Sequence, residues 1–235
     1  IRTQELLAAR RIDGGEQFFT RAYDFGYSKT PQETFNKWDK EKILSDVVWV
    51  IRKFQPDVII NRFPTTGEGG HGHHTASGIL ANEAYEAAAD PGRFPEQLKF
   101  VSVWKAKRVL WNTFNFGGTN TTRDDQFKID VGGYNPLLGK SYGEIAAESR
   151  SQHKSQGFGV PASRGESMEF FKATQGDQPV NDLMEGVELS WKRVTGAEAI
   201  GKKIDSLIST FDLLHPERSV EGLVKLYTAI NNLPD

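Results

Sequence analysis

The residue types best suited to chemistry gather in one short run, His71-Gly72-His73-His74, which holds three of the five histidines in the chain. The run follows an apolar segment, residues 56–60, that is typical of a buried strand, and it precedes a segment, residues 75–89, that is typical of a helix. Imidazoles in a glycine-rich turn between a strand and a helix indicate a divalent metal site or an acid–base centre. The alternative is a surface turn with spare histidines, although solvated turns rarely concentrate His and Gly while excluding Asn, Asp and Lys.

Zinc is one metal that the run could bind, because zinc accepts neutral imidazole as a ligand. The chain has no cysteine, so a metal must be held by histidine and carboxylate side chains. His71 and His74 can converge on one centre, but a catalytic zinc typically takes about three protein ligands and keeps a further position for water. At least one ligand must therefore come from elsewhere. The remaining histidines, His153 and His215, have surroundings that favour surface positions over metal binding.

Arg62 is a second candidate, because it stands at the end of the strand that precedes the histidine run. Its guanidinium could hold an anionic or hydroxyl-rich substrate, and the alternative is an ordinary surface salt bridge. Arg2 and Glu5 lie one turn apart on the first predicted helix and on their own indicate only an exposed helix pair.

Composition narrows the class of protein. Hydrophobic residues make up 37% of the 235 and charged residues 26%, which is an ordinary globular balance. The net charge is −2, with acidic and basic residues interspersed, and this argues against a nucleic-acid partner. We also expect no membrane span, because no apolar run is long enough.

The predicted elements form an α/β succession in which the histidine run follows the carboxyl end of a strand. Ligands collect at such strand ends in open α/β sheets. We expect helices over residues 1–12, 39–54, 75–89 and 142–154, and strands over residues 17–23, 58–61, 107–112 and 127–131. Residues 161–197 are polar and glycine-rich, so we expect a loop-rich excursion there, followed by a helical appendage or linker over residues 198–235.

Three stretches within residues 1–160 resemble the PIG-L or LmbE-like deacetylases, and most closely the long bacterial members. Arg2 to Ala9 is similar to the family's Arg-x-x-Glu helix. Residues 56–60 followed by 71–74 are similar to its strand and His-x-Asp-His segment. Residues 129–131 with 151–156 are similar to its late strand and the helix that ends near Ser-Gln.

The resemblance implies a fold and an activity. The expected fold is a Rossmann-like three-layer sandwich with a mainly parallel sheet, N-terminally truncated, plus C-terminal helices. The expected activity is zinc-dependent de-N-acetylation of an N-acetylglucosamine-type sugar conjugate. His74 would be a zinc ligand, His71 would be the electrophilic or general-acid histidine, and Arg2 would face the substrate, a small molecule or glycan. Export to the periplasm or beyond is the localisation that the long members suggest.

Two departures from the family pattern qualify these expectations. The family's Ala-His-Pro-Asp-Asp signature, which supplies two ligands and the base, would lie upstream of Ile1, so we expect this chain to be part of a longer protein and inactive by itself. His73 stands where the family has Asp, so it either alters His71 or serves as a substitute ligand. His153 is a further uncertain site residue, for which a surface position is favoured over metal binding. The alternative function is a non-catalytic carbohydrate-binding domain with a degenerate metal site, alongside other domains of the same chain.

Overall fold

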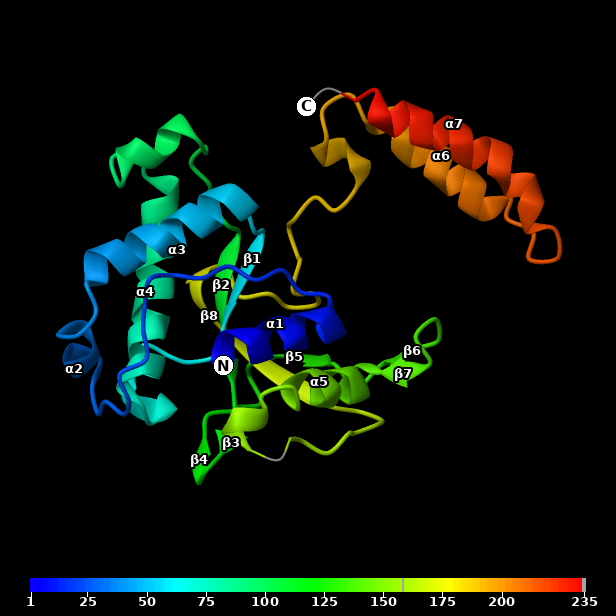
Figure 1. Ribbon diagram of the computed structural model, residues 1–235. Helices are drawn as coiled ribbons and strands as arrows, with labels where there is room; N and C mark the ends of the chain where they lie inside the picture. Colours follow the sequence, from blue (N-terminus) through cyan, green and yellow to red (C-terminus); the bar gives the residue numbers. More distant parts are fainter. Residues whose placement is uncertain (158, 234–235) are drawn as a thin grey trace. The chain divides into compact units, whose positions relative to one another are not determined.

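The computed structural model describes residues 1–157 and 159–233, which divide into two compact units, Ile1–Glu185 and Gly186–Asp235 (Figure 1). The first unit holds the histidine run, the sheet and five of the α-helices. The predicted boundary at residue 160 therefore falls inside this unit, and the unit extends to Glu185.

The two predicted helices in the first quarter of the chain are confirmed. α1 (Arg2–Asp13) ends at Gly14, whose left-handed φ of 74° closes the last turn. α3 (Lys40–Phe54) begins at Asp39, whose side chain accepts a hydrogen bond from the backbone N–H of Lys42. The apolar face of α3 is buried, as its helical spacing predicts.

A strand–helix–strand unit positions the histidines. β1 (Val58–Asn61) pairs in parallel with β2 (Arg108–Thr113), and α4 (Gly72–Ala89) lies in the connection between them. The histidine run lies where the loop after β1 enters α4, which confirms its predicted place beyond the carboxyl end of a strand. The helix begins three residues earlier than the predicted Thr75, so His73 and His74 belong to its first turn.

The sheet is mixed, not mainly parallel. Its strand order is β1-β2-β8-β5, and β8 (Met168–Gly176) runs antiparallel to both β2 and β5 (Phe127–Asp130). The chain is thus an α/β protein, but only the β1–β2 pairing of this described sheet is parallel. The prediction of a loop-rich excursion over residues 161–197 is wrong for residues 168–176, because they form a strand between two others.

Apolar side chains pack on both faces of the sheet. Ile59 packs against the core formed by α3 and α4. The adjacent residue Val58 points to the other face, as successive strand residues do, and packs there against Leu110, Phe127 and Phe171. Phe171 belongs to β8, so the misassigned segment supplies part of the core.

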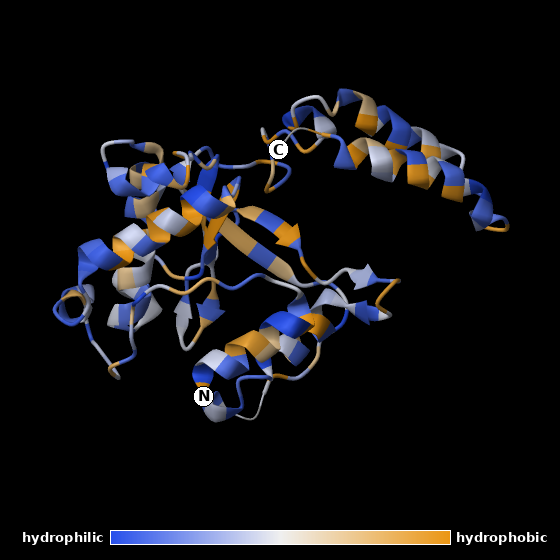
Figure 2. Ribbon diagram, turned by 45° about the horizontal axis from the view of Figure 1, so that its top comes forward, coloured by the Kyte–Doolittle hydropathy of each residue, from blue (hydrophilic) through white to orange (hydrophobic). Residues whose placement is uncertain are grey.

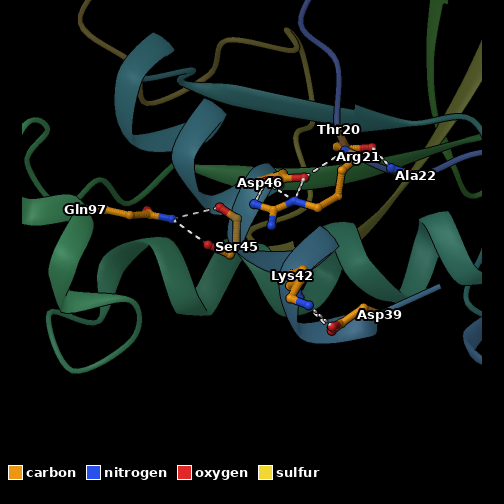
Figure 3. Close-up of polar contacts among 8 residues, drawn as sticks. All are labelled: Thr20, Arg21, Ala22, Asp39, Lys42, Ser45, Asp46 and Gln97. Carbon is orange, nitrogen blue, oxygen red and sulfur yellow. Dashed lines mark hydrogen bonds and ion pairs between the residues drawn. The ribbon is translucent and has the colours of Figure 1, made fainter.

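Residues 17–23, all of which the structure describes, have no regular secondary structure, so the prediction of a strand there is wrong. A bidentate ion pair between Arg21 and Asp46 holds this segment to α3. Arg21 Nη2 lies 2.6 Å from Asp46 Oδ1, and Arg21 Nε lies 2.9 Å from Asp46 Oδ2 (Figure 3). The backbone N–H of Arg21 also donates to Asp46, so one carboxylate binds both the side chain and the main chain of the segment.

Shorter elements complete the first unit. α5 (Tyr142–Arg150) begins with a capping box between Ser141 and Glu144 and packs on α1. The others are α2 (Pro31–Phe35) and two small hairpins, β3 (Asn115–Phe116) with β4 (Thr119–Asn120) and β6 (Tyr134–Asn135) with β7 (Lys140–Ser141).

The second unit is helical, as predicted for its last part. α6 (Glu198–Ser209) and α7 (Val220–Asn231) contact each other. Hydrophilic residues interrupt the apolar ones along both helices in Figure 2. Within the described residues, no helix has the length and apolar character needed to cross a membrane.

Candidate functional site

The hydrogen bond of His74 fixes which of its ring nitrogens carries the proton. Its Nδ1 lies 2.8 Å from the backbone oxygen of Gly69. A carbonyl oxygen can only accept, so Nδ1 carries the proton and the neutral ring presents an unprotonated Nε2. The ring also stacks flat on Phe63, with centroids 3.6 Å apart and planes 2° from parallel. A backbone acceptor behind one nitrogen and a free lone pair on the other is the arrangement of a metal-binding histidine.

The glycines before the run make this arrangement possible. A Cβ on Gly69 would lie 3.1 Å from His74 Cβ and 3.2 Å from Phe63 Cδ1, which is tighter than ordinary packing. Gly70 adopts a left-handed φ of 68°, a conformation that favours glycine, and turns the chain toward the helix. The Gly-Gly pair is therefore part of what places the His74 ring.

His71 has the opposite proton arrangement. It is the N-cap of α4, and its Nδ1 accepts a hydrogen bond from the backbone N–H of His73 over 3.1 Å. A backbone N–H can only donate, so Nδ1 is unprotonated and the neutral ring carries its proton on Nε2. Burial lowers the pKa of His71, and the neighbouring His74 lowers it further, while Asp24 raises it. His71 thus presents an N–H donor where His74 presents a lone pair.

His73 lies behind His71 and supports it. Its Nδ1 is 3.1 Å from His71 Nδ1 and 3.1 Å from Ser28 Oγ. Because His71 Nδ1 is an acceptor, His73 Nδ1 must carry the proton in that contact. The ring packs against Phe25 and Trp38, with centroids 4.4 Å and 4.9 Å away. Its Nε2 is buried and makes no hydrogen bond to any described residue, and burial lowers the pKa of the ring.

One cavity brings most of the predicted residues together. It has a volume of about 350 Å³. Arg2, His71, His73 and His74, all predicted from the sequence, lie in its wall. The other lining residues are Ala22, Tyr23, Asp24, Gly26 and Trp38.

Asp24 is the functional candidate that the sequence did not reveal. It pairs with Arg2 over 2.7 Å, between the guanidinium Nη1 and Oδ2. The backbone N–H of Gly26 is the largest cause of its lowered pKa, followed by Arg2 and the two nearby histidines, His73 and His71. In the sequence, Asp24 stands two residues before a glycine in a loop, a pattern shared by many turns. Only the folded arrangement places its carboxylate beside the imidazoles.

An ion pair and an indole hydrogen bond help to hold the segment that carries Asp24. The Arg21–Asp46 pair fixes it to α3 on one side (Figure 3). The indole Nε1 of Trp38 donates to the backbone oxygen of Tyr23 over 2.8 Å on the other. The part of the cavity wall that carries Asp24 is therefore tied to the helical core by an ion pair and a buried indole.

The structure does not bring Arg62 or His153 to this cavity. Arg62 donates to Asn112 Oδ1 and lies 4.0 Å from Glu169, and it lines a separate cavity of about 570 Å³. His153 lines a small cavity of about 40 Å³ beside Arg150. Its Nδ1 is buried without a hydrogen bond to any described residue.

The described residues do not form a complete metal centre. Among them, no three His, Cys, Asp or Glu side chains lie close enough to hold one ion together. His74 is oriented as a single ligand, and His71 presents a donor instead of a second lone pair. A zinc ion at this position would need further ligands.

Comparison with known families found no family model that matches the chain, and no curated protein matches it.

Proposed function

We propose that this chain carries part of the active site of a zinc-dependent hydrolase of the PIG-L or LmbE-like type, within a Rossmann-like three-layer domain. The reaction would be de-N-acetylation of an N-acetylglucosamine-type sugar conjugate. One observation supports the proposal most strongly: two imidazoles in one cavity have opposite proton arrangements, each fixed by a backbone partner. A lone pair for a metal and an N–H for a substrate oxygen are what such a hydrolase requires side by side.

The roles follow from the atoms that each residue presents. His74 would be a zinc ligand through Nε2. When bound, zinc supplies Lewis-acid polarisation of an amide carbonyl and a more acidic water. His71 would donate its Nε2–H to the oxygen that becomes negative as the amide carbon turns tetrahedral. His73 would hold the His71 ring in place, as a neutral donor where the family has a carboxylate.

Arg2 and Asp24 would contact the sugar. They form an exposed pair in the wall of the same cavity. A guanidinium and a carboxylate together offer donors and acceptors for neighbouring hydroxyl groups. Their exposure leaves them free to exchange their mutual contact for contacts with a ligand.

Zinc content and acetate release, measured on the full-length protein, test the proposal. We expect His74→Ala to lose both zinc and acetate release from N,N′-diacetylchitobiose. His71→Ala should keep the zinc and lose most of the activity, because it removes the Nε2–H donor and no ligand. His215→Ala, a histidine in the second unit that faces Glu217 at 3.3 Å, is the matched control and should change neither. Full zinc content and activity in His74→Ala would refute the proposal.

A second function is favoured by the lack of a three-ligand group among the described residues. In this alternative, the chain is a non-catalytic carbohydrate-binding domain with a degenerate metal site. Sugar binding would then survive treatment with a chelator, and acetate release would be absent with or without added zinc. Calorimetric measurement of the affinity for N,N′-diacetylchitobiose, before and after a chelator removes the metal, separates the two functions.

A further inference from the structure

A second cavity, larger than the histidine site, lies in the same unit. It has a volume of about 570 Å³, within the range of about 300–1,000 Å³ typical of small-molecule sites. One side is the face of α5 that carries Tyr142, Ala146 and Arg150, and Arg62 and Glu169 also line it. The residues of the histidine cavity do not contribute to its lining.

Residues 160–163 form another wall, and Gly143 allows them to approach α5 closely. A Cβ on Gly143 would lie 2.5 Å from Ser163 Oγ and 2.7 Å from the Ser163 backbone oxygen. Ser141 Oγ donates to that same backbone oxygen over 2.9 Å. The wall is thus fixed to the start of α5 by a tight contact and a hydrogen bond.

The charges that line this cavity do not balance. Two guanidinium groups, Arg62 and Arg150, line it with one carboxylate, Glu169. Arg150 is exposed and makes no side-chain hydrogen bond or ion pair within the described part of the chain. Glu169 accepts a hydrogen bond from the Asn112 amide over 2.7 Å and lies 4.0 Å from Arg62, so its charge is already shared.

We propose that this cavity binds an anionic ligand whose oxyanion group, a carboxylate or a phosphate, contacts Arg62 and Arg150 together. A guanidinium presents a planar fork of N–H donors that matches the oxygens of such a group. The exposed hydroxyl-bearing Tyr142 adds a donor on the same wall. The one carboxylate in the lining leaves an excess of one positive charge, which an anion would offset. This inference does not depend on the deacetylase activity, because it uses neither the histidines nor a metal.

Calorimetric titration of the full-length protein at constant ionic strength tests the site with three probes: inorganic phosphate, glucuronate and glucose. We expect phosphate or glucuronate to bind and glucose, the uncharged match to glucuronate, not to bind. Whichever anion binds more tightly identifies phosphate or carboxylate as the preferred group. Arg150→Ala should weaken that binding at least about tenfold, the effect of losing a charge-assisted hydrogen bond.

Two controls keep the test decisive. Arg150→Ala should melt at the wild-type temperature without ligand, because the Arg150 side chain has no hydrogen-bond or ion-pair partner among the described residues. Arg11→Ala removes an exposed arginine on α1 that does not line the cavity and should leave the affinity unchanged. The proposal is overturned if neither anion binds, if glucose binds as tightly as glucuronate, or if Arg150→Ala and Arg11→Ala bind the anion equally well.

Discussion

The imidazole rings of His71 and His74 lie 5.2 Å apart, centroid to centroid, and the two rings carry their protons on different nitrogens. The two histidines are three positions apart in the sequence, yet one accepts a hydrogen bond from a donor and the other donates to an acceptor. The helix start supplies the donor, His73 N–H, and the preceding turn supplies the acceptor, Gly69 C=O. The backbone therefore differentiates two chemically identical side chains.

Gly72→Ala should destabilise the protein by about 1–3 kcal/mol, the usual cost of forcing extra atoms into a packed site. A Cβ at Gly72 would overlap the backbone oxygen of Thr30 and lie 2.5 Å from Ser28 Oγ. Gly67→Ala, in the connection that precedes α4, is the matched control, because a Cβ there meets nothing within 4 Å. Urea unfolding of the two variants measures the difference, and equal midpoints would contradict the packing described for the start of α4.

Replacing Arg52 with Met should lower the free energy of unfolding by about 3 kcal/mol or more, since it leaves several buried carbonyl oxygens without a donor. The side chain is 1% exposed and donates to the backbone oxygens of Ala87, Ala88 and Asp90 near the end of α4. Lys53→Met changes the adjacent, exposed cation of the same helix and should cost far less. Thermal unfolding of both variants provides the comparison. A similar fall in melting temperature for Arg52→Met and Lys53→Met would mean that Arg52 does not stabilise the end of α4.

Arg21→Ala should weaken substrate binding more than it weakens the fold. The pair with Asp46 is partly exposed, so its loss should lower the free energy of unfolding by no more than about 1 kcal/mol. The cavity wall that carries Asp24 would lose its ion pair with α3, and we expect KM to rise several-fold with kcat little changed. Lys42→Ala breaks another α3 ion pair, with Asp39, that does not hold the wall (Figure 3). Equal KM values for the two variants would argue against this role for Arg21.

Acid should destabilise the protein in part through Glu144. The hydrogen bond from Arg164 is the largest cause that lowers the pKa of this carboxyl from 4.5 to about 2. A lowered folded-state pKa means that the unfolded chain binds the proton more tightly, so this stabilisation is complete above about pH 4.5 and is lost as the pH falls toward 2. Glu144→Gln should therefore flatten the decline in melting temperature across that window.

Arg164→Ala separates this pKa effect from the capping role of Glu144. It keeps the carboxylate and its bonds to Ser141 but removes the guanidinium, so the pKa of Glu144 should rise and the acid-induced decline should become shallower. Melting curves between pH 6 and pH 2 compare the two variants with the wild type. If the melting temperatures of both Glu144→Gln and Arg164→Ala fell with pH as steeply as that of the wild type, Glu144 would not be a source of the acid sensitivity.

Sequence signals within a few residues of each helix were sufficient to predict α1 and α3. The cap at Asp39, the stop at Gly14 and the apolar periodicity of α3 are all encoded within a few residues. Strand β8 could not be predicted in this way, because its identity depends on pairing with β2 and β5, which lie far away in the sequence. The segment over residues 17–23 shows the converse, since it has strand-forming residues but binds α3 through Arg21 instead of pairing with a strand.

The site shows the same division between local and long-range information. The residue types of His71 and His74 were sufficient to predict that they belong together, whereas their proton arrangement depends on backbone atoms that only the fold positions. Asp24 was missed because its role depends on Arg2 and the histidines being nearby. Arg62 was grouped with the histidines because it ends β1, but its side chain lines a different cavity.

The most direct test of the central claim is anomalous diffraction at the zinc edge from crystals of the full-length protein grown with zinc. We predict an anomalous peak about 2.0–2.1 Å from His74 Nε2, inside the cavity that His71 lines, with His74 Nδ1 still bonded to Gly69 and no bond from the metal to His73. A cavity without a peak in zinc-loaded crystals, or a zinc ion bonded to His74 through Nδ1, would contradict the account.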